Sequence, residues 1–162
     1  MNKGLVLTIA AAALTCLALA AWSPKQDAKP LLLTRQDLDW GLGPDAFPLG
    51  VHASIVEGDP DQDEPFTMRF KLPGKYRIEP HWTTREQRLT VLSGSIELAL
   101  GERFDERKLK TYGEGSYLVI PARARYYLKC DRGSVLELRS QGPWEVNYVD
   151  RADDPREQAA SL

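Results

Sequence analysis

Cysteine and histidine are scarce in this chain of 162 residues, which contains only two of each. Cys16 lies in an apolar N-terminal run, and removal of that run would leave Cys130 as a lone cysteine, unable to form an internal disulfide. We interpret Cys130 as a small buried apolar residue rather than a reactive thiol. An exported form of this protein must therefore be stabilised by its core and not by cross-links.

A strong excess of charge is also absent. The chain has 21 Lys and Arg against 23 Asp and Glu, a formal net charge of -2, and both signs are interspersed. This balance gives no indication of a basic surface of the kind that binds nucleic acid, so no nucleic-acid partner is expected. The length and the 43% hydrophobic content suit one domain with a real core and are too small for two comfortable ones.

The N-terminus has the three-part layout of a secretory signal peptide. Lys3 gives a positive start, the run from 5 to 21 is uncharged and apolar, and Ala18-Leu19-Ala20 is a small-x-small pattern. Cleavage after Ala20 would place the protein in the periplasm or outside the cell, with no stable membrane span. Two alternatives stay open. The run is close to the minimum length of an uncleaved membrane anchor, and Cys16 would be a lipoprotein site if Thr15 were not a poor match before it.

The rest of the chain divides into a leader and arm (22–50), a β domain (51–150) and a polar tail (151–162) that is expected to be short helix or disorder. Within the β domain, short apolar runs of period two alternate with turn residues, a pattern typical of strands. We predict strands at Val51–Val56, Phe66–Leu72, Tyr76–Thr83, Arg88–Ser93, Ser95–Leu100, Tyr117–Ile120, Arg125–Cys130, Val135–Arg139 and Trp144–Val149. Ser93-Gly94-Ser95 is interpreted as a hairpin turn. The pattern predicts an all-β closed barrel or sandwich with few or no long helices.

Two segments resemble the two sequence motifs of the cupin superfamily. The first, Gly74–Gly94, contains GKYRIEPHWT followed by EQRLTVLSG, and the second, Gly115–Tyr126, reads GSYLVIPARARY. Gly142-Pro143-Trp144 is similar to the closing segment of small bacterial cupins. The resemblance covers 50 to 156 and implies an RmlC-like jelly-roll β-barrel that holds a ligand or a metal ion inside.

The chain departs from this family at the metal ligands. The motifs imply His, His, Glu and His where this sequence has His81, Thr83, Gln87 and Tyr126. A divalent transition metal needs three or four His or carboxylate ligands, and a neutral hydroxyl or amide binds it weakly. We therefore expect a degenerate metal site and no metal or cofactor. The alternative is a site rebuilt with nearby carboxylates, for which Glu79, on the predicted face of His81, is a candidate.

The remaining polar residues suggest ligand binding. His81, Thr83, Gln87 and Tyr126 should face the interior if the family register holds. Arg139 is expected to point into the same cavity, where a buried Arg needs a partner. That partner would be Glu137 on the same strand face, or a bound anion. The expected ligand is a small polar or anionic molecule.

Two other classes of function stay open. The resemblance to metal-independent sugar epimerases on this scaffold implies a His base that works with a Tyr acid. His81 and Tyr126 would take these roles, and no catalytic residue is otherwise assigned. The third class is an interaction protein. Trp82, Tyr76 and Ile78 are predicted on the strand face opposite His81, where they would pack under the arm or form a homodimer interface.

Overall fold

A computed structural model of the chain describes residues 29–159, and the β domain lies in the unit that begins at Leu33. Ten strands account for nearly all of its regular structure. They are β1 (Gly41–Leu42), β2 (His52–Glu57), β3 (Pro65–Leu72), β4 (Tyr76–Thr83), β5 (Gln87–Leu100), β6 (Lys110–Gly113), β7 (Tyr117–Ile120), β8 (Tyr126–Cys130), β9 (Ser134–Gln141) and β10 (Val146–Tyr148). The helical elements in this part of the chain are two 3-10 turns, η1 (Glu106–Lys108) and η2 (Arg151–Asp153), and a five-residue helix, α1 (Pro155–Ala159). The predicted all-β class is confirmed.

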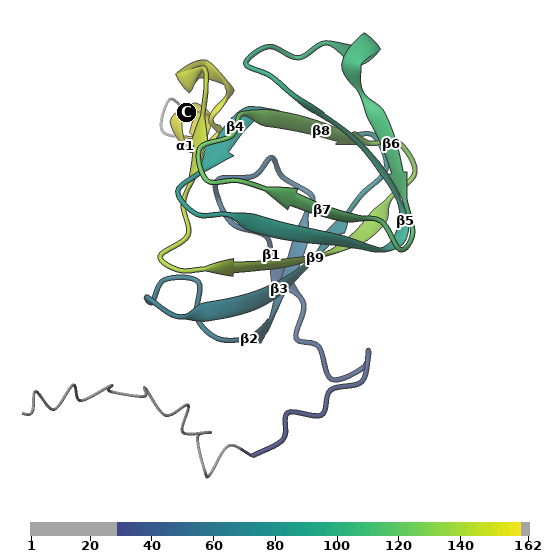
Figure 1. The fold of residues 1–162 in the computed structure, drawn as a ribbon, viewed down its shortest axis with the longest axis vertical. Helices are drawn as coiled ribbons and strands as arrows, with labels where there is room; N and C mark the ends of the chain where they lie inside the picture. The colour runs from purple at the N-terminus through teal and green to yellow at the C-terminus, as the bar shows by residue number, and fades with distance from the viewer. Residues whose placement is uncertain (1–28, 160–162) are drawn as a thin grey trace, which may run out of the picture. The chain divides into compact units, whose positions relative to one another are not determined.

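All strand pairs are antiparallel, and they form one curled sheet in the order β1-β2-β3-β9-β5-β8-β4-β10, with β6 and β7 also paired to β5. Two layers result, which Figure 1 shows with β4 and β8 in the upper part of the view and β9, β3 and β2 in the lower part. The side chains between the layers form a single apolar core.

Strand β5 joins the two layers. Its first half pairs with β7 and β9, and its second half pairs with β6 and β8. The hairpin predicted at Ser93-Gly94-Ser95 is therefore wrong, because the chain continues as one 14-residue strand with a register shift between Val91 and Ser93. Gly94 allows the bend. Its φ of +73° suits glycine, and a Cβ there would lie 2.4 Å from the Gly133 carbonyl oxygen.

A second irregularity in β4 decides which residues face the core. The pairing with β8 shifts register between Ile78 and His81, so both of these side chains are buried although they are three residues apart. The predicted simple alternation is wrong here, because a β-bulge adds one residue and reverses the faces. Tyr76 and Ile78 consequently belong to the core, and of the proposed dimer face only Trp82 remains outside it.

The expected burial of Cys130 is confirmed, and its thiol contacts the Ser134 hydroxyl. Two aromatic residues of the N-terminal arm pack on the domain. Phe47 is buried in the core, and the Trp40 ring lies 3.7 Å from the Lys71 ammonium.

The predicted signal peptide falls outside the described residues. Within residues 29–159 no helix is long and apolar enough to span a membrane.

Candidate functional site

Four of the predicted site residues meet inside the barrel. His81 and Thr83 come from β4, Gln87 from the start of β5 and Tyr126 from the start of β8. Their proximity follows from the strand pairing, because His81 lies opposite Tyr126 in the ladder between β4 and β8. All four side chains are buried, with exposed fractions from 0% to 3%. The four positions that the sequence motifs singled out therefore lie together in the interior.

Three of these residues satisfy one another through a directed hydrogen-bond chain. The Tyr126 hydroxyl donates to Gln87 Oε1 at 3.2 Å, and Gln87 Nε2 donates to Thr83 Oγ1. The Thr83 hydroxyl then donates to the backbone carbonyl of Arg85 at 2.9 Å. Buried polar groups require such partners, and these three hydrogen bonds supply them without any formally charged group. The arrangement holds the side chains of residues 83, 87 and 126 in place.

His81 has a different hydrogen-bonding state at each ring nitrogen. Nδ1 lies 2.7 Å from the Glu79 carbonyl oxygen, and a carbonyl only accepts, so Nδ1 carries the proton. Burial lowers the pKa of His81 to about 4, and the imidazole is therefore neutral at pH 7. Nε2 must then be a hydrogen-bond acceptor, yet it is buried without a partner. An unpaired buried acceptor is costly, and this one is the most distinctive feature of the site.

Aromatic rings surround the His81 imidazole. The ring centroids of Tyr126, Tyr148 and Phe47 lie 4.2, 5.8 and 6.4 Å from that of His81. Burial raises the pKa of the Tyr126 and Tyr148 hydroxyls well above its ordinary value, so both phenols stay protonated. Sequence reasoning gave no site role to Phe47 or Tyr148. Phe47 follows turn residues in an irregular arm, where no period indicates which side chains point inward.

The donor set does not fit a transition-metal ion. It offers one imidazole nitrogen, while the Gln87 amide and the two hydroxyls are already hydrogen-bonded to one another. The carboxylates do not rebuild the site, because the bulge turns Glu79 outward into an ion pair with Arg77, and Glu86 pairs with Arg88 at the surface. Across residues 29–159 no group of three His, Cys, Asp or Glu side chains is arranged to hold a metal.

Arg139 does not belong to the cluster. On β9 the side chains of Leu136 and Leu138 face the core, and strand alternation places Glu137 and Arg139 on the outer side. The Arg139 side chain is 64% exposed and pairs with Glu137, which Arg69 also contacts at 2.9 Å. The predicted inward position of Arg139 is therefore wrong, and with it the cationic group for an anionic ligand is lost from the interior.

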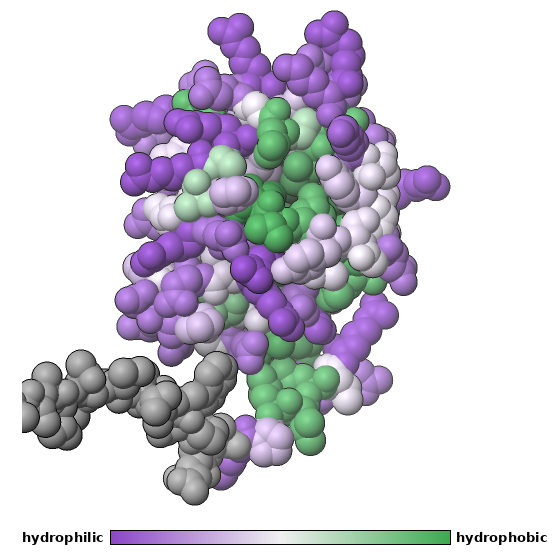
Figure 2. All heavy atoms as spheres, in the orientation of Figure 1, coloured by the Kyte–Doolittle hydropathy of each residue, from purple (hydrophilic) through white to green (hydrophobic). Residues whose placement is uncertain are grey.

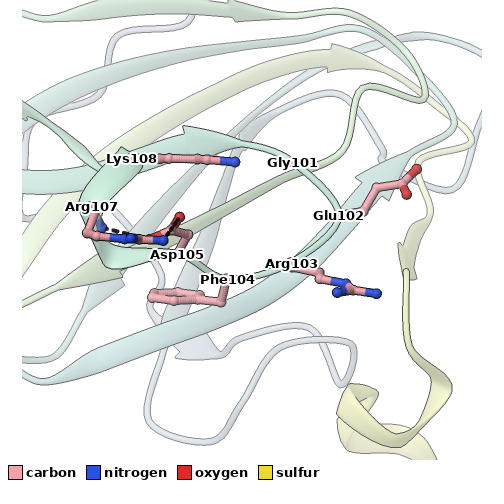
Figure 3. Close-up of a pocket in the computed structure, with 7 residues that line it drawn as sticks. All are labelled: Gly101, Glu102, Arg103, Phe104, Asp105, Arg107 and Lys108. Carbon is pink, nitrogen blue, oxygen red and sulfur yellow. Dashed lines mark hydrogen bonds and ion pairs between the residues drawn. The ribbon is translucent and has the colours of Figure 1, made fainter.

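The surface has a hollow apart from the His81 cluster. A hollow of about 580 Å³ lies open at the loop after β5, between Gly101 and Lys108. Figure 3 shows Asp105 paired with Arg107, while Glu102 and Arg103 point away from that pair. One short loop supplies every residue that lines it. Elsewhere, Figure 2 shows apolar side chains on the face near β7 and β8, and Tyr117 and Val119 of β7 are exposed. Neither feature converges on an unpaired buried group as the His81 cluster does.

Comparison with known proteins identifies the fold. Neither a protein-family profile nor a curated protein sequence matches the chain. Among solved structures, the polyketide cyclase RemF from Streptomyces resistomycificus is similar with a TM-score of 0.65 and 19% identity, over 80% of this chain and 92% of the cyclase. A putative acetylacetone dioxygenase from Methylibium petroleiphilum PM1 has a TM-score of 0.60 and 18% identity, over 82% and 90% of the two chains. An RmlC-like cupin from Shewanella frigidimarina has a TM-score of 0.53 and 11% identity, over 71% and 94%. The chain therefore has the cupin fold, an all-β jelly-roll barrel.

Proposed function

We propose that this cupin barrel works without a metal and binds one small neutral molecule, which donates a hydrogen bond to Nε2 of His81. The observation that carries the proposal is the buried, unpartnered Nε2 of a histidine whose other nitrogen is held by the Glu79 carbonyl. A ligand donor would satisfy that lone pair. A neutral ligand is favoured over an anion, because the rings and uncharged polar groups of the site offer no cation.

A thermal-shift screen of neutral alcohols, amides, sugars and aromatic compounds, with acidic metabolites included, tests this proposal. We expect a neutral donor to raise the melting temperature, and His81→Phe to weaken its binding by about 10-fold or more, the usual cost of leaving one hydrogen bond unmade. His52→Phe is the matched control, since His52 is exposed and outside the site. A ligand that binds both variants equally well would show that His81 Nε2 is not the recognition point.

A second candidate is acid–base catalysis by His81 and Tyr126. Their rings lie 4.2 Å apart, Nε2 is free to accept a proton and Tyr126 is protonated. Two features argue against it: the pKa of about 4 makes His81 a weak base at neutral pH, and its Nδ1 is oriented by a carbonyl instead of a carboxylate. Deuterium entering a bound ligand in heavy water would favour catalysis, and an unchanged ligand would favour binding alone.

We also propose that the protein acts outside the cytoplasm, on the strength of the charged start and apolar run of the sequence. Expression of the full chain in a bacterium followed by intact-mass analysis of the periplasmic fraction is expected to give a chain that begins at Ala21. A full-length product that pellets with membranes would support the uncleaved anchor instead.

A further inference from the structure

The Phe47 ring occupies the centre of the aromatic cluster beside His81. Its centroid lies 5.5 Å from that of Phe70, 6.0 Å from that of Trp144 and 6.4 Å from that of His81, each in an edge-on arrangement. Only 8% of the residue is exposed. Phe47 thus fills space that adjoins the imidazole with a flat aromatic group, and it does so without supplying a donor to Nε2.

The segment that carries this ring, residues 44–50, is attached to the barrel by a small number of hydrogen bonds. It lies between β1 and β2 and pairs with neither, and the bond from Gly43 N to Val51 O closes it into a loop of its own. The Tyr148 hydroxyl donates to the Ala46 carbonyl at 2.8 Å, and the Tyr76 hydroxyl donates to the Pro48 carbonyl at 2.6 Å. Displacing this loop would break no strand ladder, so its cost is the loss of these two hydrogen bonds and the exposure of Ala46 and Phe47, which belong to the apolar core.

The chemistry around His81 selects among neutral ligands. The rings of Phe47, Tyr126 and Tyr148 pack around the imidazole. The hydroxyl of Tyr126 and the amide of Gln87 are already used in the hydrogen-bond chain. A sugar or polyol would bring several hydroxyls to a place where His81 Nε2 is an unpartnered acceptor and Trp144 Nε1 an unpartnered donor. Each hydroxyl beyond these would lose its water without a replacement partner. A flat ring with one donor would match both the rings and the single lone pair.

We infer that the ligand is a neutral aromatic molecule with one hydroxyl or N–H donor, which takes the position of the Phe47 ring when the 44–50 loop lifts. This inference rests on the proposed function, since it names the ligand class of the same site. The protein's own Phe47 then competes with the ligand. The apparent affinity equals the affinity of the open state multiplied by the fraction of molecules in which the loop is open.

Phenol, toluene and cyclohexanol separate the two requirements when each is titrated into the full chain and into its Phe47→Ala variant. Phenol and toluene share a shape but differ in the donor, whereas cyclohexanol has the donor without the aromatic ring. We expect phenol to bind Phe47→Ala at least about 10-fold more tightly than the unaltered chain, and toluene to bind that variant about 10-fold more weakly than phenol. The 15N shift of His81 Nε2 should move with phenol and stay unchanged with toluene.

Leu49→Ala is the matched control, because Leu49 belongs to the same loop but is 96% exposed, and we expect it to leave phenol affinity unchanged. Tyr148→Phe removes the hydroxyl bond to Ala46 and keeps Phe47, so it tests loop release if Phe47→Ala fails to fold. We expect phenol affinity to rise by about threefold.

Absence of phenol binding in either folded variant would overturn the inference, as would equal binding of toluene. Tighter binding of cyclohexanol with the same Nε2 shift would overturn the aromatic class and leave the proposed function standing, whereas tight phenol binding that ignores His81→Phe would overturn both.

Discussion

A variant carrying Thr83→His, Gln87→Glu and Tyr126→His is expected to bind one divalent transition-metal ion, whereas the unaltered chain is expected to retain none. The three substitutions restore the ligand set that the cupin motifs imply. Their positions already converge, since Gln87 contacts both Thr83 and Tyr126, and the Tyr126 ring lies against His81. At a free-metal concentration 100 times the dissociation constant, binding would add about 2.7 kcal/mol to the free energy of unfolding.

Elemental analysis after incubation with zinc, manganese, iron or nickel and extensive dialysis measures the outcome. Adding His81→Ala to the restored variant is the control, and it should abolish retention because it removes one of four ligands. A folded variant that retains no metal would mean that these positions do not have coordinating geometry. Near-stoichiometric metal in the unaltered chain, lost in His81→Ala, would contradict the argument that the site has lost its metal.

The sequence predicted the location of this cluster better than the path of the strands that build it. Two short motifs identified positions 81, 83, 87 and 126. Pairing of β4 with β8 brings His81 opposite Tyr126, and Gln87 at the start of β5 bonds to Thr83 and Tyr126. The bulge between Ile78 and His81 was not predictable from alternation, because one extra residue reverses every face beyond it. The continuity of β5 was also not predictable from local composition. Ser93-Gly94-Ser95 has the composition of a turn, but in the structure it bends a continuous strand.

Side chains that depend on long-range packing were the least predictable. Arg139 was predicted to point into the cavity from the strand face that it shares with Glu137, yet β9 directs that face outward, where the two side chains pair. Phe47 lies 34 residues before His81 in the chain (81 − 47), on a loop that local propensity cannot place. The unpaired Nε2 is likewise a property of the assembled barrel, and it leads to a measurable pH dependence of stability.

The free energy of unfolding is expected to fall by about 3 kcal/mol as the pH is lowered from 6.5 to 4, through His81 alone. Burial lowers the pKa of His81 to about 4 in the folded protein, against an ordinary value of 6.5. Between these two values the unfolded chain takes up a proton that the folded barrel excludes, so protonation stabilises the unfolded state. The contribution is complete above pH 6.5, is lost as the pH falls toward 4, and does not change further below 4, where both states are protonated.

Urea unfolding between pH 7.5 and 4.5 measures this dependence, and the comparison with His81→Phe isolates it from the titration of the carboxylates. The variant lacks the ionisable ring, so its stability should change less over this interval, and the difference between the two proteins should account for most of the 3 kcal/mol. His52→Phe should retain the full dependence, because that side chain is exposed. Equal slopes for the unaltered chain and His81→Phe would contradict a neutral, water-excluded imidazole. The free Nε2 lone pair would then have solvent as its partner, and both the ligand proposal and the displacement of Phe47 would lose their physical basis.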